Sequence, residues 1–164
     1  MTARAPRPRR LVAVLVLLAA ALAAAGCGSG GIGREQQAQQ DALQYEQQIG
    51  QINTAAAVPA VSAQDTRDRL AATVKRYAAL HPPTFLRTLH RRILRALRDE
   101  LRSVKGGLRA TAAGDGAGIG RAQVANARSR AGVTRLLGQI AARIGRCRTS
   151  LPACVPASPS TGSG

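Results

Sequence analysis

Cys27 occupies a position where a cysteine thiol has chemistry available to it. Met1–Arg10 carries four arginines and no acidic residue, Leu11–Ala25 contains only Leu, Val and Ala, and Gly26 then precedes the cysteine. A basic head, an apolar middle and a small-residue exit are typical of a secretory signal. The cysteine directly after the small residues distinguishes this segment from an ordinary secretory signal.

The segment that ends at Cys27 resembles the lipobox of bacterial lipoproteins. The resemblance implies that the thiol is joined to diacylglycerol and that the chain is cut just before it. Residues 1–26 would then be a signal peptide, and the mature lipoprotein would carry acyl chains such as palmitate. Residues 27–33, rich in Gly, would form a flexible lipid-anchored spacer on the outer face of the cell membrane.

Two alternatives for this start remain open. One is a permanent transmembrane anchor, although the apolar run of 15 residues, 11–25, is shorter than the roughly 20 that a spanning helix needs. The other is a cleaved signal without lipid, because Ala24 stands where the lipobox more often has Leu. Arg9 and Arg10 leave export by either the general or the twin-arginine route open.

Cys147 and Cys154 are the remaining two cysteines, an even pair in a chain predicted to be exported. Disulfides persist in such oxidising compartments, so the pair predicts a disulfide. Closing a loop of about eight residues would stabilise the fold by about 2.5 kcal/mol in the chain-entropy model. Two thiols with no third Cys or His nearby do not form a zinc site.

A row of basic residues is the one further feature that could form a site. Its members recur every three or four positions and share one side of a predicted helix: Arg87, Arg91, Arg95, Arg98, Arg102, Lys105 and Arg109. The row is centred about 120° around the helix from an apolar stripe. It is interpreted either as a solvated face or as an anion-binding surface, since a guanidinium suits phosphate geometry.

No residue pattern points to catalysis, a cofactor or a bound metal. The Gly-x-Ser-x-Gly turn of hydrolases is absent, and residues 114–120 lack the Gly-Lys-Ser/Thr ending of a phosphate-binding loop. The two histidines have no ligand partners at suitable spacing. His81 is predicted to cap a helix C-terminus, and His90 is predicted to be a half-buried packing residue.

Composition excludes further classes of function. Without residues 1–26 the chain has 138 residues, 20 of them basic and 8 acidic, which gives a net charge of about +12. The aromatic residues are only Tyr45, Tyr77 and Phe85. Proteins that bind single-stranded nucleic acid need aromatic platforms as well as charge, so the composition argues against nucleic acid as a partner.

Beyond the spacer the pattern predicts four amphipathic helices separated by Gly and Pro. They cover about 34–57, 63–80, 85–113 and 117–147, and Ser62 and Thr84 are predicted caps. The third helix carries an apolar stripe of Leu86, Leu89, Ile93, Leu97, Leu101, Val104 and Leu108. The fourth carries a face of Ile119, Ala122, Val133, Leu137, Ile140, Ala141 and Ile144. A bend is expected at 106–107, and residues 155–164 are predicted to be a disordered tail.

Short connections between four such helices predict an all-α, up-down-up-down antiparallel four-helix bundle over residues 34–154. The order of features resembles small helical lipoproteins of actinobacteria that have no assigned activity. The matching residues are Cys27, Tyr45, Leu80, Pro82, Pro83, His90, Gly114, Asp115 and Cys147. The resemblance implies a bundle and a membrane location but no reaction.

These observations favour a lipid-anchored, non-enzymatic protein with a structural or scaffold role at the cell envelope. The alternative is an anion-binding module that uses the arginine-rich helix. Its partner would be anionic lipid, a wall polymer or an acidic protein, because basic residues near an anionic surface each add about 1 kcal/mol of attraction.

Overall fold

A computed structural model describes residues 32–154, and all regular structure in this range is helical. The α-helices are α2 (Ile32–Ala56), α3 (Ala63–Ala78), α4 (Arg87–Ala112) and α5 (Gly116–Thr149), and the short 3-10 helices are η1 (Thr84–Leu86) and η2 (Leu151–Cys154). The predicted all-α class is therefore confirmed. The predicted signal peptide, the lipidated cysteine and the predicted tail lie outside the described residues.

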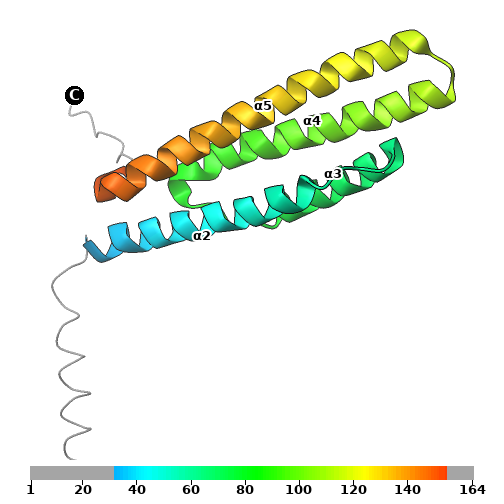
Figure 1. The fold of residues 1–164 in the computed structure, drawn as a ribbon. Coiled ribbons are helices and arrows are strands. Elements are labelled where there is room, and N and C mark those ends of the chain that lie inside the picture. The colour runs from blue at the N-terminus through cyan, green and yellow to red at the C-terminus, as the bar shows by residue number, and fades with distance from the viewer. Residues whose placement is uncertain (1–31, 155–164) are drawn as a thin grey trace, which may run out of the picture. The chain divides into compact units, whose positions relative to one another are not determined.

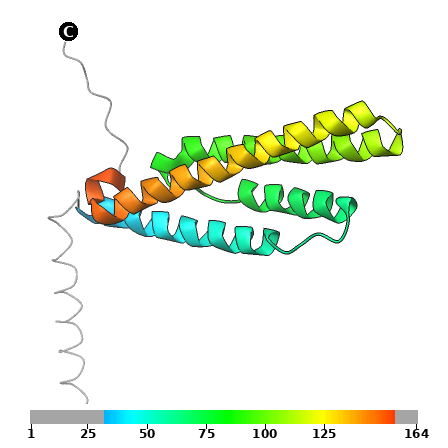
Figure 2. The same ribbon diagram turned by 45° about the horizontal axis from the view of Figure 1, so that its top comes forward.

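Helices α4 and α5 run side by side and are joined by the turn at 113–115 (Figure 1). Helices α2 and α3 lie on one side of this α4–α5 hairpin in both views (Figures 1 and 2). Polar contacts tie α2 to its neighbours: the Tyr77 hydroxyl on α3 donates to Asn53 Oδ1 at 2.8 Å, and Gln39 Nε2 donates to the Cys147 carbonyl of α5 at 3.3 Å. The result is a helical bundle. Within residues 32–154, no helix is both long and apolar enough to cross a membrane.

Local capping explains two of the helix starts. The Asp65 amide donates to Ser62 Oγ at 3.0 Å, as the sequence predicts, and Asp65 Oδ2 accepts from the Val61 amide at 3.0 Å. At α5, the Gly118 amide donates to Asp115 Oδ1 at 2.8 Å. The preceding Gly114 has φ of 67°, a left-handed conformation that glycine adopts without a steric penalty.

The predicted cap at Thr84 is wrong. Thr84 belongs to η1, and the residue that precedes α4, Leu86, makes no side-chain cap. The chain leaves Pro83 in extended geometry and tightens through η1 before α4 begins.

The expected bend at 106–107 does not interrupt α4, which runs on to Ala112. A Cβ added at Gly107 would lie 3.4 Å from the Ala122 side chain, an ordinary van der Waals contact, so α4 and α5 pack against each other at this position.

The core lies between α2, α3 and the inner part of the α4–α5 hairpin, which consists of residues 87–97 and 136–149. Its buried apolar side chains are Ala42, Tyr45, Ile49, Ile52, Tyr77, Phe85, Leu86, Leu89, Ile93, Leu97, Leu136, Ile140 and Ile144. Burial of the predicted α4 stripe stops at Leu97, and Leu101, Val104 and Leu108 are only half-buried. On α5 the predicted apolar face is wrong at two positions. Leu136 was not part of the predicted face but is buried, and Ala141 was part of it but is exposed.

Candidate functional site

Helix α4 holds all seven predicted cations on one side, here called the basic face: Arg87, Arg91, Arg95, Arg98, Arg102, Lys105 and Arg109. Every one of these residues is exposed. At about 100° per residue, their spacing confines them to about 80° of the helix circumference. The basic face is therefore a narrow row of positive charge along almost the whole helix.

Packing of α4 fixes the direction of this face. Leu89, Ile93 and Leu97 are buried on the side that contacts the rest of the bundle. Since an α-helix has a fixed rotation per residue, burying those three side chains turns the basic face away from the core. Leu94 and Leu101 are half-buried and border the basic face, so a shallow depression between the cations has an apolar edge.

Few acidic side chains neutralise the basic face. Arg102 pairs with Asp99 on the same helix. The other six cations have no carboxylate within 4.0 Å among residues 32–154. An exposed pair such as Arg102–Asp99 contributes little to stability, about 0–1 kcal/mol. The positive charge therefore remains available to an external anion.

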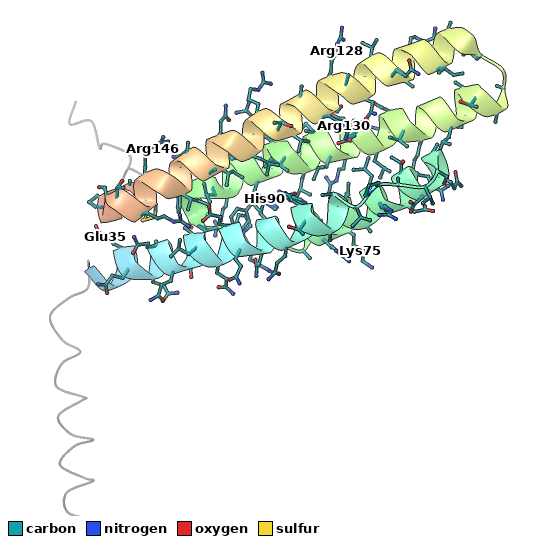
Figure 3. All side chains as sticks on the ribbon, in the orientation of Figure 1. Glu35, Lys75, His90, Arg128, Arg130 and Arg146 are labelled. Carbon is teal, nitrogen blue, oxygen red and sulfur yellow. A yellow bond between two sulfur atoms is a disulfide. The ribbon has the colours of Figure 1, made fainter. Side chains whose placement is uncertain are left out.

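The arginines of α5 divide into those that pair with acidic residues and those that share the outer side of the helix. Arg148 Nη2 lies 2.5 Å from Glu46 Oε2 on α2, Arg130 Nε lies 3.5 Å from Glu100 Oε1 on α4, and Arg121 Nη2 lies 3.4 Å from Asp115. Figure 3 shows Arg128 and Arg146 projecting from the outer side of α5. A second row of cations therefore lies on α5: Arg121, Arg128, Arg135, Arg143 and Arg146 are exposed and share about 80° of the helix circumference. Among the described residues, only Arg121 of this row has a carboxylate within 4.0 Å.

The two histidines differ from the sequence predictions. His90 is only 5% exposed rather than half-buried, and its Nδ1 lies 2.8 Å from the Tyr45 hydroxyl, between α2 and the hairpin (Figure 3). Burial lowers the pKa of His90 and raises the pKa of Tyr45. His81 is exposed and lies beyond Ala79, the residue that caps α3, so its predicted capping role is wrong.

Enclosure of the Tyr45–His90 pair gives it a structural role. Tyr45 is 1% exposed, and its ring meets the imidazole edge to face at a centroid distance of 5.9 Å. Because both groups are covered, the pair satisfies two polar groups inside the core and aligns α2 with α4. Sequence reasoning singled out His90 but did not connect it with Tyr45, since the two residues are 45 positions apart.

The Cys147 and Cys154 sulfur atoms are at bonding distance, as the spacing predicts, and the Cα atoms are 4.7 Å apart. Both cysteines are buried, and the link holds η2 against the end of α5. In the part of the chain that the structure describes, no three His, Cys, Asp or Glu side chains gather closely enough to hold a metal ion.

Comparison with protein-family models, with curated proteins and with solved structures finds no match for this chain.

Proposed function

We propose that this protein is a lipid-anchored protein on the outer face of the cell membrane, with a non-enzymatic structural or scaffold role at the cell envelope. The observation that carries the proposal is Cys27 at the end of a secretory-type signal. Only residues 28–31 separate it from Ile32, where α2 begins. A lipid on Cys27 would therefore hold the helical bundle close to the membrane surface.

In this proposal α2, α3, α4 and α5 form an up-down-up-down antiparallel bundle. Support comes from the short connections at 57–62, 79–86 and 113–115, which favour antiparallel neighbours. Further support comes from the polar contacts that α2 makes with each of the other three helices. A rigid unit of this kind suits a scaffold, because it presents fixed surfaces while the anchor supplies the location.

The decisive test is mass spectrometry of the protein isolated from the membrane fraction. The expected N-terminus is Cys27 carrying diacylglycerol, and two acyl chains would give stable anchoring. The matched variant is Cys27→Ser, which keeps the signal but removes the thiol and should appear without lipid. An unmodified Cys27 in a chain that still contains residues 1–26 would refute the proposal.

The second candidate function is anion binding by the basic face. The observation that favours it is the concentration of seven exposed cations on one side of α4, with a carboxylate beside only Arg102 among the described residues. Such a row suits a polymer or surface that carries repeated phosphate or carboxylate groups. Anionic lipid, a wall polymer and an acidic protein all meet that description.

Two charge-matched quadruple variants test this candidate. One replaces Arg91, Arg95, Arg98 and Arg102 by Gln, and the control replaces Arg121, Arg128, Arg135 and Arg146 by Gln. All eight residues are exposed, and each set contains one cation with a neighbouring carboxylate. Polyphosphate binding by the full chain should weaken by at least about tenfold in the first variant only. It should also fall steeply with added salt.

Equal loss in the two variants would mean that binding reflects only the net charge. No loss in either would leave the basic face as a solvated surface and would favour the scaffold role alone.

A further inference from the structure

A cavity of about 470 Å³ lies where the end of α2 and the connection after it meet α3, α4 and α5. Its volume falls within the range of small-molecule sites, roughly 300–1,000 Å³. The apolar part of its wall includes Leu70, Leu97, Val104 and Val133, together with the Ala, Val and Pro residues at 56–60. The polar part includes Glu100 and Asn126, which determine what the cavity can hold.

Glu100 is a carboxylate without a close hydrogen-bond donor. Its side chain is 14% exposed, whereas the other ion-paired carboxylates are 25–60% exposed. Its nearest cation, Arg130, approaches only to 3.5 Å. Burial raises the pKa of Glu100, and Arg130 offsets part of that rise. A buried carboxylate is costly unless donors satisfy its oxygens, so this one has room for a further donor.

Arg130 is a partner that a ligand could replace. It comes from α5 on the side toward α4 (Figure 3), and its side chain is 71% exposed. It can therefore turn into solvent without losing a buried contact. The other cation on the wall, Arg69, is already engaged: its Nε donates to Asp65 at 2.8 Å and its Nη1 donates to the Val58 carbonyl at 3.1 Å.

Asn126 adds a second acceptor on the same wall. Its Oδ1 is buried and has no hydrogen-bond partner among the described residues. Glu100 and Asn126 thus each carry an acceptor without a close donor among the described residues, a carboxylate oxygen and an amide oxygen. A complementary molecule must donate hydrogen bonds, and it must cover an apolar wall.

We propose that this cavity binds a small organic cation with an apolar body, such as an alkyl or aryl amine, and that the Glu100 carboxylate receives its ammonium group. The apolar body packs against Leu97, Val104 and Val133. The net positive charge of the chain opposes any cation at long range, but physiological salt screens exposed charges beyond about 8 Å. The local carboxylate therefore decides the selectivity. This inference does not depend on lipidation or on the basic face.

Calorimetric titration of the full chain in a nonionic detergent tests the proposal. The probe is 2-phenylethylammonium, and its comparators are neutral 2-phenylethanol and anionic 3-phenylpropionate, each corrected for binding to detergent alone. We expect saturable binding of the ammonium probe, at least about tenfold tighter than either comparator, because only the cation pairs with the carboxylate.

Three variants make the assignment specific. Glu100→Gln should weaken ammonium binding by at least about tenfold, since it removes the charge and keeps the shape. Glu46→Gln is the matched control, because it also breaks a carboxylate pair with an α5 arginine, and it should bind like the parent. Arg130→Gln should tighten binding severalfold by removing the competing cation.

If Glu100→Gln fails to fold, Arg130→Gln still tests the proposal. Absence of saturable binding, preference for the carboxylate probe, or weaker binding in Arg130→Gln would each overturn the proposal. Unchanged binding in a folded Glu100→Gln protein would do the same.

Discussion

The inner and outer halves of the α4–α5 hairpin are built from the same two helices but pack very differently. In the inner half, residues 87–97 and 136–149, His90 and seven apolar or cysteine side chains are buried. In the outer half, residues 98–135, no residue is fully buried. Gly and Ala are frequent along the outer part of α5, where they permit close approach but bury little apolar area. Both helices therefore continue through the outer half, although no buried core stabilises them there.

The two halves also differ in how their polar groups are paired. The inner half holds its polar groups in satisfied pairs such as Tyr45–His90, whereas the outer half carries Glu100 and Asn126 without close donors. Incomplete packing leaves space for the cavity, and a tight core would have filled it. The proposed ligand site and the weak packing are thus two consequences of the same composition.

The largest expected effect comes from truncating one leucine in each half. Leu97 is 4% exposed, so Leu97→Ala should lower the free energy of unfolding by about 2–5 kcal/mol. Leu108→Ala removes the same atoms from a half-buried position and should cost about 1 kcal/mol. Chemical denaturation of both variants measures the difference. Equal losses would show that the outer half is packed as well as the inner half.

Reduction of the Cys147–Cys154 link should give the next largest effect. The link closes a short loop at the end of the inner half, and its removal should cost about 2.5 kcal/mol in the chain-entropy model. Thermal melts with and without a reductant measure this loss. Non-reducing peptide mapping should recover the two cysteines joined, and two freely alkylated thiols would contradict the expectation.

Acidification should weaken the inner half through His90. Burial lowers its pKa below the usual 6.5, so the unfolded chain binds more protons than the native protein as the pH falls below about 6.5. The contribution of His90 to stability is therefore present above that pH and is lost as the pH falls toward the lower native pKa. NMR titration should find the imidazole half-protonated below pH 6.5, and the variant His81→Gln leaves a single histidine to follow.

Glu100 acts in the opposite sense, because its raised pKa makes the native state bind more protons than the unfolded chain near and above pH 4.5. Comparing the pH dependence of melting for the parent and His90→Gln separates the two groups. Identical pH dependence in both proteins would remove His90 from the explanation.

The smallest expected effect is that of a single substitution on the basic face. Arg95 is exposed and has no carboxylate partner within 4.0 Å among the described residues. Arg95→Ala should therefore change the free energy of unfolding by less than about 0.5 kcal/mol. A loss comparable with that of Leu97→Ala would mean that the orientation of α4 is wrong.

The helices and most of their ends follow from the sequence, because their causes are local. Ser62 caps α3, the turn at Gly114 and Asp115 begins α5, and the pairing of Cys147 with Cys154 follows from two cysteines seven positions apart. The exposure of the basic face also follows, since a helix of fixed pitch places it opposite the buried leucines. Thr84 was a misleading local signal, because the two preceding prolines lead into η1 rather than directly into α4.

Only the tertiary structure decided how deeply each apolar residue is buried and which polar groups meet. The helical periodicity places Leu97 and Leu108 on the same apolar stripe, but the burial of each side chain depends on which other helices cover it. The contacts of His90 with Tyr45 and of Arg148 with Glu46 join residues 45 and 102 positions apart, so no local pattern predicts them. The cavity beside Glu100 arises in the same way, because residues from four helices line it.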